Sequence, residues 1–126
     1  MINLKQQSNS DINNINLINS DKDYMYKLDS KDNIYYCKKP CNGNWVQIPG
    51  SLRQITSDGQ NLYGVNSKSD IYTCKVPCDK GDWRQISGKL KSINADNSIF
   101  LFGVNKNNNG YMCNKPCLQG KWKQIN

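Results

Sequence analysis

The sequence predicts an all-β protein built from three copies of one four-stranded unit, and three observations lead to this prediction. A Cys-x-x-Pro-Cys element occurs three times, and the second cysteines lie 37 and then 39 residues apart. A Trp-x-Gln-Ile segment follows each element. Short runs of aromatic and β-branched residues alternate with Gly, Asn, Asp and Ser, and no helical periodicity persists. Together these features are typical of a repeat protein made of short strands.

Each unit contains four segments that favour a β-strand. The first is Leu-x-x-Ile, with Ile15 in place of the leucine in the first unit, and the second is Leu-Tyr/Phe-Gly-Val-Asn. The third ends at the first cysteine, and the fourth is Trp-x-Gln-Ile. In the first unit Met25–Asp29 replaces the second segment, so the glycine and asparagine are lost there. The units span about residues 15–51, 52–89 and 90–126, and residues 1–14 are expected to form a polar N-terminal arm.

The length of the unit points to a β-propeller, because four strands in about 38 residues match one propeller blade. Propellers close with about four to eight blades, so three blades leave two sheet faces uncovered. We therefore expect half of a six-bladed propeller that is completed by homodimerisation. We also expect the last strand, around Trp122, to find no local sheet to complete, so that it docks on a first blade of its own chain or of a partner. A β-trefoil, which uses three units of similar length and closes as a monomer, is the alternative.

The repeated motifs resemble the tectonin repeat. The resemblance rests on Trp-x-Gln-Ile-x-Gly-x-Leu, at residues 45–52 and 83–90, followed by Leu-Tyr/Phe-Gly-Val-Asn. The tectonin family includes fish-egg lectins and tachylectin-1-like lectins. The resemblance implies a six-bladed propeller that binds glycans or lipopolysaccharide. This chain has half the usual number of blades, and its first unit lacks Gly-Val-Asn, which puts a ligand site on that unit in doubt.

The cysteines favour one disulfide bond inside each unit. Each bond would close a small loop and add about 2 kcal/mol to the free energy of unfolding. Free buried thiols and structural zinc are the alternatives, although zinc prefers Cys-x2-Cys pairs assembled four at a time. We expect no metal and no cofactor. Disulfides would indicate an oxidising location, extracellular or on a particle, while the N-terminus lacks a signal-peptide core and leaves the cytoplasm open. The expected pairs are Cys37–Cys41, Cys74–Cys78 and Cys113–Cys117.

An enzyme is not expected. The chain has no histidine, and no nucleophile–base pair or recurring carboxylate pair can be assembled. No apolar run reaches the roughly 18 residues needed to span a bilayer, so membrane insertion is not expected. The net charge is +7, and six of these charges fall in the three segments that run from the first cysteine of each pair to just past the tryptophan. A repeat places such segments on one rim, which we therefore expect to be basic.

Each candidate ligand residue also has a structural explanation. A tryptophan can stack on a sugar ring or wedge between blades, and an asparagine can bind a hydroxyl or cap a turn. Tyr26, Tyr63 and Phe102 are expected in the core, and Gly64 and Gly103 are expected to permit close packing. The candidate ligand residues are Trp45, Trp83, Trp122, Asn66, Asn105, Lys38, Lys75, Lys115, Arg84 and Lys123.

The function that these features favour is a non-enzymatic, lectin-like module, a homodimer that recognises glycans or anionic envelope sugars multivalently. Repetition of weak sites on one rigid face raises avidity when the target is also repetitive. A structural or assembly protein that uses the propeller as a protein–protein platform is the first alternative. Nucleic-acid binding by the lysine rim is the second, and steep salt dependence would identify it.

Overall fold

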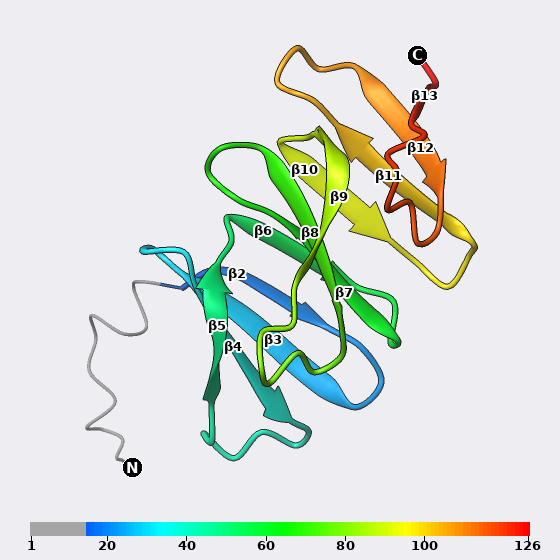
Figure 1. Ribbon diagram of the computed structural model, residues 1–126. Helices are drawn as coiled ribbons and strands as arrows, with labels where there is room; N and C mark the ends of the chain where they lie inside the picture. Colours follow the sequence, from blue (N-terminus) through cyan, green and yellow to red (C-terminus); the bar gives the residue numbers. More distant parts are fainter. Residues whose placement is uncertain (1–14) are drawn as a thin grey trace.

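The computed structural model describes residues 15–126, which form three separate four-stranded antiparallel sheets (Figure 1). The predicted arm at residues 1–14 lies outside the described residues. In each sheet the strands follow one another in chain order. Sheet 1 consists of β2 Ile15–Ser20, β3 Tyr24–Asp29, β4 Asn33–Lys38 and β5 Val46–Ser51; sheet 2 of β6 Gln54–Ser57, β7 Asn61–Val65, β8 Asp70–Lys75 and β9 Arg84–Lys89; and sheet 3 of β10 Ser92–Ala95, β11 Phe100–Val104, β12 Gly110–Asn114 and β13 Lys123–Gln124.

The sheets follow one another along an arc, and their first strands lie side by side (Figure 1). β6 contacts both β2 and β10, so the first strand of each sheet faces the neighbouring sheet. One sheet for each repeat is the arrangement of propeller blades, and nothing in residues 15–126 favours the trefoil alternative. The prediction for the last strand was wrong, because β13 completes its own sheet by pairing with β12.

The hydrophobic core lies between the sheets rather than inside any one of them. At the first junction, between sheets 1 and 2, Tyr26, Leu28 and Ile48 pack against Leu52 and the neighbouring apolar side chains of sheet 2. The second junction repeats this packing between sheets 2 and 3. Tyr26 and Tyr63 are fully buried, as predicted, while Phe102 is half-buried. Each sheet therefore buries its face only against a neighbour.

At each junction the fourth strand of the first sheet ends in a bulge that contacts the tryptophan of the next sheet. In sheet 1 the pairing skips from Ile48 to Ser51, which leaves Pro49 and Gly50 as extra residues. Gly50 has a φ of 118°, a conformation that glycine adopts without strain. A Cβ atom there would lie 2.9 Å from the indole nitrogen of Trp83 in sheet 2. The bulge at Gly88 in sheet 2 receives Trp122 in the same way, with a φ of 120°.

Close packing also explains the glycines of the second strand. A Cβ atom at Gly64 would lie 2.5 Å from a methyl group of Leu52, and Gly103 packs against Leu90 in the same way. These contacts agree with the predicted role of the two glycines in close approach. In sheet 1 the same position carries Lys27, which pairs with Ile18 of β2. The first unit therefore cannot copy this packing.

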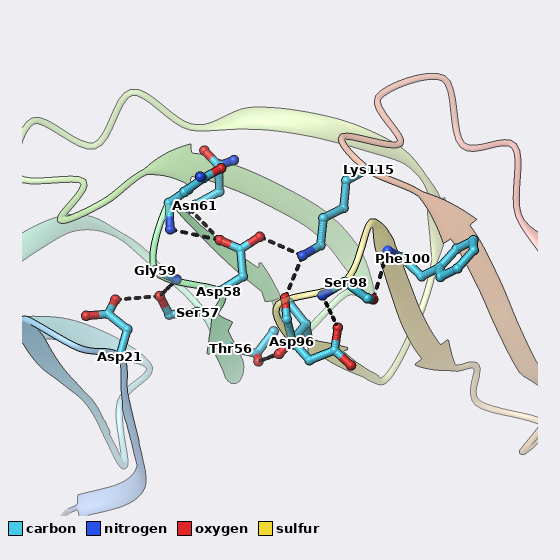
Figure 2. Close-up of polar contacts among 12 residues, drawn as sticks. Asp21, Thr56, Ser57, Asp58, Gly59, Asn61, Asp96, Ser98, Phe100 and Lys115 are labelled. Atoms are coloured by element: carbon cyan, nitrogen blue, oxygen red, sulfur yellow. Dashed lines mark hydrogen bonds and ion pairs between the residues drawn. The ribbon is translucent and has the colours of Figure 1, made fainter.

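Polar contacts between sheets involve one repeated aspartate (Figure 2). At the first junction Asp21 accepts hydrogen bonds from the hydroxyls of Tyr26, at 2.8 Å, and of Ser57, at 2.6 Å. At the second junction Asp58, at the same repeat position, accepts one from the ammonium group of Lys115 at 2.7 Å. Burial raises the pKa of Asp58, but the Lys115 bond and two backbone N–H bonds outweigh burial and hold that pKa below its usual value. Asp58 is therefore ionised in the folded protein at neutral pH.

The three predicted cysteine pairs lie at disulfide-bonding distance, with Cα separations of 5.3, 5.7 and 5.8 Å. In every copy a cis proline precedes the second cysteine, whose φ lies between 62° and 63°. Each of the three cysteine pairs lies within its own repeat unit. Residues 15–126 contain no helix long and apolar enough to cross a membrane.

Candidate ligand site at the sheet junctions

Equivalent pockets lie at the two junctions. The first has a volume of about 320 Å³ and the second of about 220 Å³. In both, the bulged end of one sheet forms one wall, and an asparagine, a tyrosine and a tryptophan of the next sheet form the other. The first pocket is lined by Gly50, Ser51, Leu52, Asn66, Tyr72 and Trp83, and the second by Gly88, Lys89, Leu90, Asn105, Tyr111 and Trp122.

The tryptophans serve the junction as well as the pocket. The indole N–H of Trp83 donates to the carbonyl oxygen of Pro49 at 2.7 Å, and that of Trp122 donates to Ser87 at 3.0 Å. Both side chains are half-buried. The indole edge is therefore committed to the preceding sheet, while part of the ring surface lines the pocket. The expected wedge between sheets is therefore what the structure shows for these two residues, and stacking of a sugar on the ring stays a prediction.

Tyr72 and Tyr111 were missed by the sequence reasoning, although each lines a junction pocket beside a tryptophan. Both are half-buried. A signal was present, because Tyr35, Tyr72 and Tyr111 occupy the third strand at the same repeat position, two residues before the first cysteine. A tyrosine offers a flat ring for stacking and a hydroxyl that can donate or accept a hydrogen bond.

The two candidate asparagines are turn caps. The side-chain oxygen of Asn66 accepts hydrogen bonds from the backbone N–H groups of Lys68 and Asp70, both at 2.9 Å. Asn105 makes the same bonds, both at 3.0 Å, within its own loop. In sheet 1, Asp29 caps the equivalent loop at 2.9 Å. The cap holds each asparagine at the pocket wall, with its oxygen already engaged.

Lysines flank the second pocket. A neighbouring hollow of about 290 Å³ shares Lys89 and Asn105 with it and is also lined by Lys68 and Lys106. Lys89 forms an ion pair with Asp70. The Lys89 hydrogen bond holds the pKa of the Asp70 carboxyl below its usual value. Three lysines, Lys68, Lys89 and Lys106, thus stand against one carboxylate, and the surroundings of the second pocket carry a net positive charge. In the first pocket Ser51 takes the position of Lys89.

The predicted basic residues lie apart from both junction pockets. Lys38, Lys75, Arg84 and Lys123 are exposed, and Lys123 lines a hollow of about 590 Å³ beside the Cys113–Cys117 loop. Lys115 differs from them because its ammonium group bonds to Asp58 and to the carbonyl oxygen of Asp96, each at 2.7 Å. In the repeat alignment Lys115 corresponds to Lys39 rather than to Lys38.

Trp45 of sheet 1 has different surroundings from Trp83 and Trp122. The ammonium group of Lys27 lies 4.5 Å from the centre of the Trp45 ring and 5.2 Å from that of Tyr35. Such cation–π contacts are worth about 0.5–1 kcal/mol at exposed sites. The structure therefore separates Trp45 from the two junction pockets. No group of three or more metal-binding side chains occurs in residues 15–126.

Solved structures with a similar fold are large and distant in sequence. Human WBSCR16 matches with a TM-score of 0.67 and 10% identity, over 89% of this chain and 38% of that one. The N-terminal domain of Nup159 matches with a TM-score of 0.60 and 12% identity, over 90% and 30%. YCF48 bound to the D1 peptide gives 0.59 and 16%, over 89% and 38%. The matched part is thus less than two fifths of each of these chains.

No curated protein matches this sequence. The structural matches above, at 10–16% identity, show the fold alone. The Tectonin domain family matches residues 2–126, nearly the whole chain. This match agrees with the repeated Trp-x-Gln-Ile motif and with the three four-stranded sheets. The chain belongs to the Tectonin domain family.

Proposed function

We propose that this protein is a carbohydrate-binding module and that the two junction pockets are its ligand sites. The observation that carries the proposal is the recurrence of one pocket, with the same asparagine, tyrosine and tryptophan, at both junctions. Aromatic faces pack on the apolar face of a sugar ring, while hydroxyl and amide groups bind its hydroxyls. Two equivalent sites on one rigid arc suit a repetitive glycan, because linked sites raise avidity.

The second pocket is proposed to prefer anionic sugars. Lys68, Lys89 and Lys106 gather beside it, so a carboxylate or phosphate substituent there is attracted electrostatically. Because these lysines are exposed, raising the salt concentration should weaken this contribution. The exposed Lys38, Lys75, Arg84 and Lys123 remain proposed members of a separate basic rim.

A glycan array tests the proposal, and affinities of the best sugar for pocket variants localise the site. Tyr72→Ala and Tyr111→Ala should each weaken binding by about tenfold at the pocket concerned, because they remove a ring and leave the tryptophan wedge in place. Lys22→Ala, which removes an exposed cation from the turn between β2 and β3, outside both pockets and the proposed rim, is the control and should bind as the parent does. A flat array, or loss of binding on Lys22→Ala alone, would contradict the assignment to the pockets.

A protein-binding platform is the second candidate, and the structural relatives support it. YCF48 was solved with the D1 peptide, and the study of Prp20p from Saccharomyces cerevisiae concerns its binding to Gsp1p and histones. Prp20p matches with a TM-score of 0.55 and 14% identity, over 80% of this chain and 33% of that one. A blank array together with specific capture of one protein would favour this function. Affinity for nucleic acid that falls steeply with salt would instead favour the lysine rim.

We further propose that two chains associate to complete a six-bladed propeller. Sheets 1 and 3 each have one neighbour among residues 15–126, so each presents one face without a covering sheet. At both junctions the faces of this repeat are buried against each other. Light scattering should give about twice the chain mass of 14.4 kDa.

A further inference from the structure

We propose that the outward face of sheet 1 binds the outward face of sheet 3 in a second copy of this chain, head to tail, through the contacts that the two internal junctions already make. This inference rests on the proposed homodimer and is independent of glycan binding. It assigns residues to the interface and excludes a face-to-face arrangement of two identical surfaces. The internal junctions supply the template, because both place equivalent repeat positions in contact.

Apolar exposure at the two ends is the first observation. Ile55 and Ile93 are 1% and 3% exposed at the internal junctions, whereas Ile18, at the same repeat position in sheet 1, is 55% exposed. On the opposite face, Ile48 and Ile86 are fully buried. Their counterpart in sheet 3, Ile125, is 54% exposed. Each position is thus buried wherever a neighbouring sheet covers it and open where none does.

Charge complementarity is the second observation (Figure 2). At the second junction the ammonium group of Lys115 bonds to the Asp96 carbonyl of its own sheet and to the Asp58 carboxylate of the preceding sheet. In sheet 1, Lys39 repeats the first of these bonds, to the carbonyl oxygen of Asp21 at 2.6 Å. Lys39 is therefore held as Lys115 is. The carboxylate that corresponds to Asp58 on the outward face of sheet 3 is Asp96. Head-to-tail docking brings Asp96 of one copy to Lys39 of the other.

Backbone contacts provide the third observation. Asn19 accepts a hydrogen bond from the Ser57 N–H at 3.0 Å at the first junction, and Thr56 accepts one from the Ala95 N–H at 3.2 Å at the second. The next pair in this series joins Asn94 of one copy to the N–H of Ser20 in the other. The indole series continues likewise, because Asn126 holds the repeat position of Pro49 and Ser87, the acceptors for Trp83 and Trp122. Trp45 of the second copy would donate there.

The outward faces of sheets 1 and 3 thus match the two sides of an internal junction. Because one chain carries both faces, the proposed binding partner is a second copy of the same chain. Contacts between two different faces are heterologous, and they form a closed ring only when the rotation between subunits returns to the start. Two copies of three sheets close after six sheets, with two identical interfaces. Every interface substitution therefore acts twice in the dimer.

Single substitutions on either face test the proposal. Ile18→Asp and Ile125→Asp should each raise the dimer dissociation constant by at least about 100-fold, because each places a charge in a desolvated apolar contact twice per dimer. Analytical ultracentrifugation of each variant alone should then show the 14.4 kDa monomer. Val46→Asp is the control, since Val46 and its counterparts Arg84 and Lys123 are exposed in all three sheets.

Mixing the two variants distinguishes the head-to-tail arrangement from any other. In a mixed dimer both substitutions fall in one interface, and the other interface keeps Ile18 and Ile125. The mixture should therefore regain dimer where each variant alone does not. A charge exchange gives a second check that does not depend on the folding of the isoleucine variants. Lys39→Glu and Asp96→Lys should each weaken the dimer by about tenfold, and the double variant should recover it.

Three results would overturn the inference. These are a parent chain that stays monomeric at micromolar concentration, a dimer that survives both isoleucine substitutions, and a mass series that rises with concentration as in an open filament. A blank glycan array with a head-to-tail dimer would overturn the carbohydrate proposal alone. A glycan-binding protein whose dimer ignores these residues would overturn this inference alone.

Discussion

The two internal junctions are alike in their apolar contacts and unlike in their polar ones. Both seat a tryptophan against a bulged glycine and bury the same repeat positions. The repeated aspartate accepts hydrogen bonds from hydroxyls at the first junction and from Lys115 at the second. The first junction has no such lysine because Val76 occupies the repeat position of Lys115. The apolar wedge is thus the constant part of the repeat. The polar groups around it are where one junction becomes different from another.

Removing the wedge should have the largest effect. Trp83→Ala and Trp122→Ala should each lower the free energy of unfolding by about 3 kcal/mol, because each opens a cavity and leaves a carbonyl oxygen without its indole donor. Trp45→Ala should cost less than half as much when the chain is dilute enough to be monomeric. Urea unfolding of the three variants makes the comparison. Equal losses for all three would show that the wedge does not depend on the preceding sheet.

Breaking the ion pair should have the next largest effect. Lys115→Met leaves the nearly buried Asp58 carboxylate without its cation, so we expect a loss of about 2–3 kcal/mol. Asp58→Asn combined with Lys115→Met should recover part of that loss, since the pair is replaced by a neutral one. The double variant should be measured beside both single variants. Additive losses would mean that the two groups do not interact.

Acid should weaken the second junction by a smaller amount. The pKa of Asp58 is depressed in the folded protein, so the ion pair contributes fully above the unfolded pKa of about 3.9. Its contribution is lost as the pH falls through the folded pKa. The urea concentration at the midpoint of unfolding should be measured from about pH 6 down to about pH 2. As the pH falls, this midpoint should decrease more steeply for the parent than for Lys115→Met. Parallel curves would contradict this assignment.

Copying the lysine into the first junction should have the smallest effect. Val76→Lys places an ammonium group near Asp21, whose carboxylate already accepts bonds from Tyr26 and Ser57. The gain from the new pair and the loss of apolar contact should cancel to within about 1 kcal/mol. The variant should become more sensitive to salt than the parent, which melting curves at two salt concentrations would reveal. Unchanged salt sensitivity would mean that the pair does not form.

The repeat pattern predicted the strands and the sheets because both depend on local periodicity and on the number of units. It also predicted the cysteine pairing, since the two cysteines of each pair are only four residues apart. The close packing at Gly64 and Gly103 followed from the same alignment. Features that lie within one unit were therefore accessible from the sequence.

Features that depend on the neighbouring unit were not accessible in the same way. The sequence prediction put Lys115 in a basic rim because it lies next to a cysteine pair. Its partner, Asp58, is 57 residues away, so the ion pair between them was not predicted. Tyr72 and Tyr111 line pockets whose other wall is the bulge of the preceding sheet. No local sequence pattern predicts that this bulge lies beside them. The last strand was misplaced because a two-residue pairing, Lys123–Gln124, is enough to complete its sheet.

The disulfide loops have a consequence for how such a chain can grow. Each covalent bridge begins and ends within one sheet, so none of them links one repeat to the next. Duplicating or deleting a whole repeat would leave every remaining cysteine with its partner. The number of repeats can therefore change without any rearrangement of the oxidised cysteines, and only the fit between neighbouring faces limits how many repeats a ring contains.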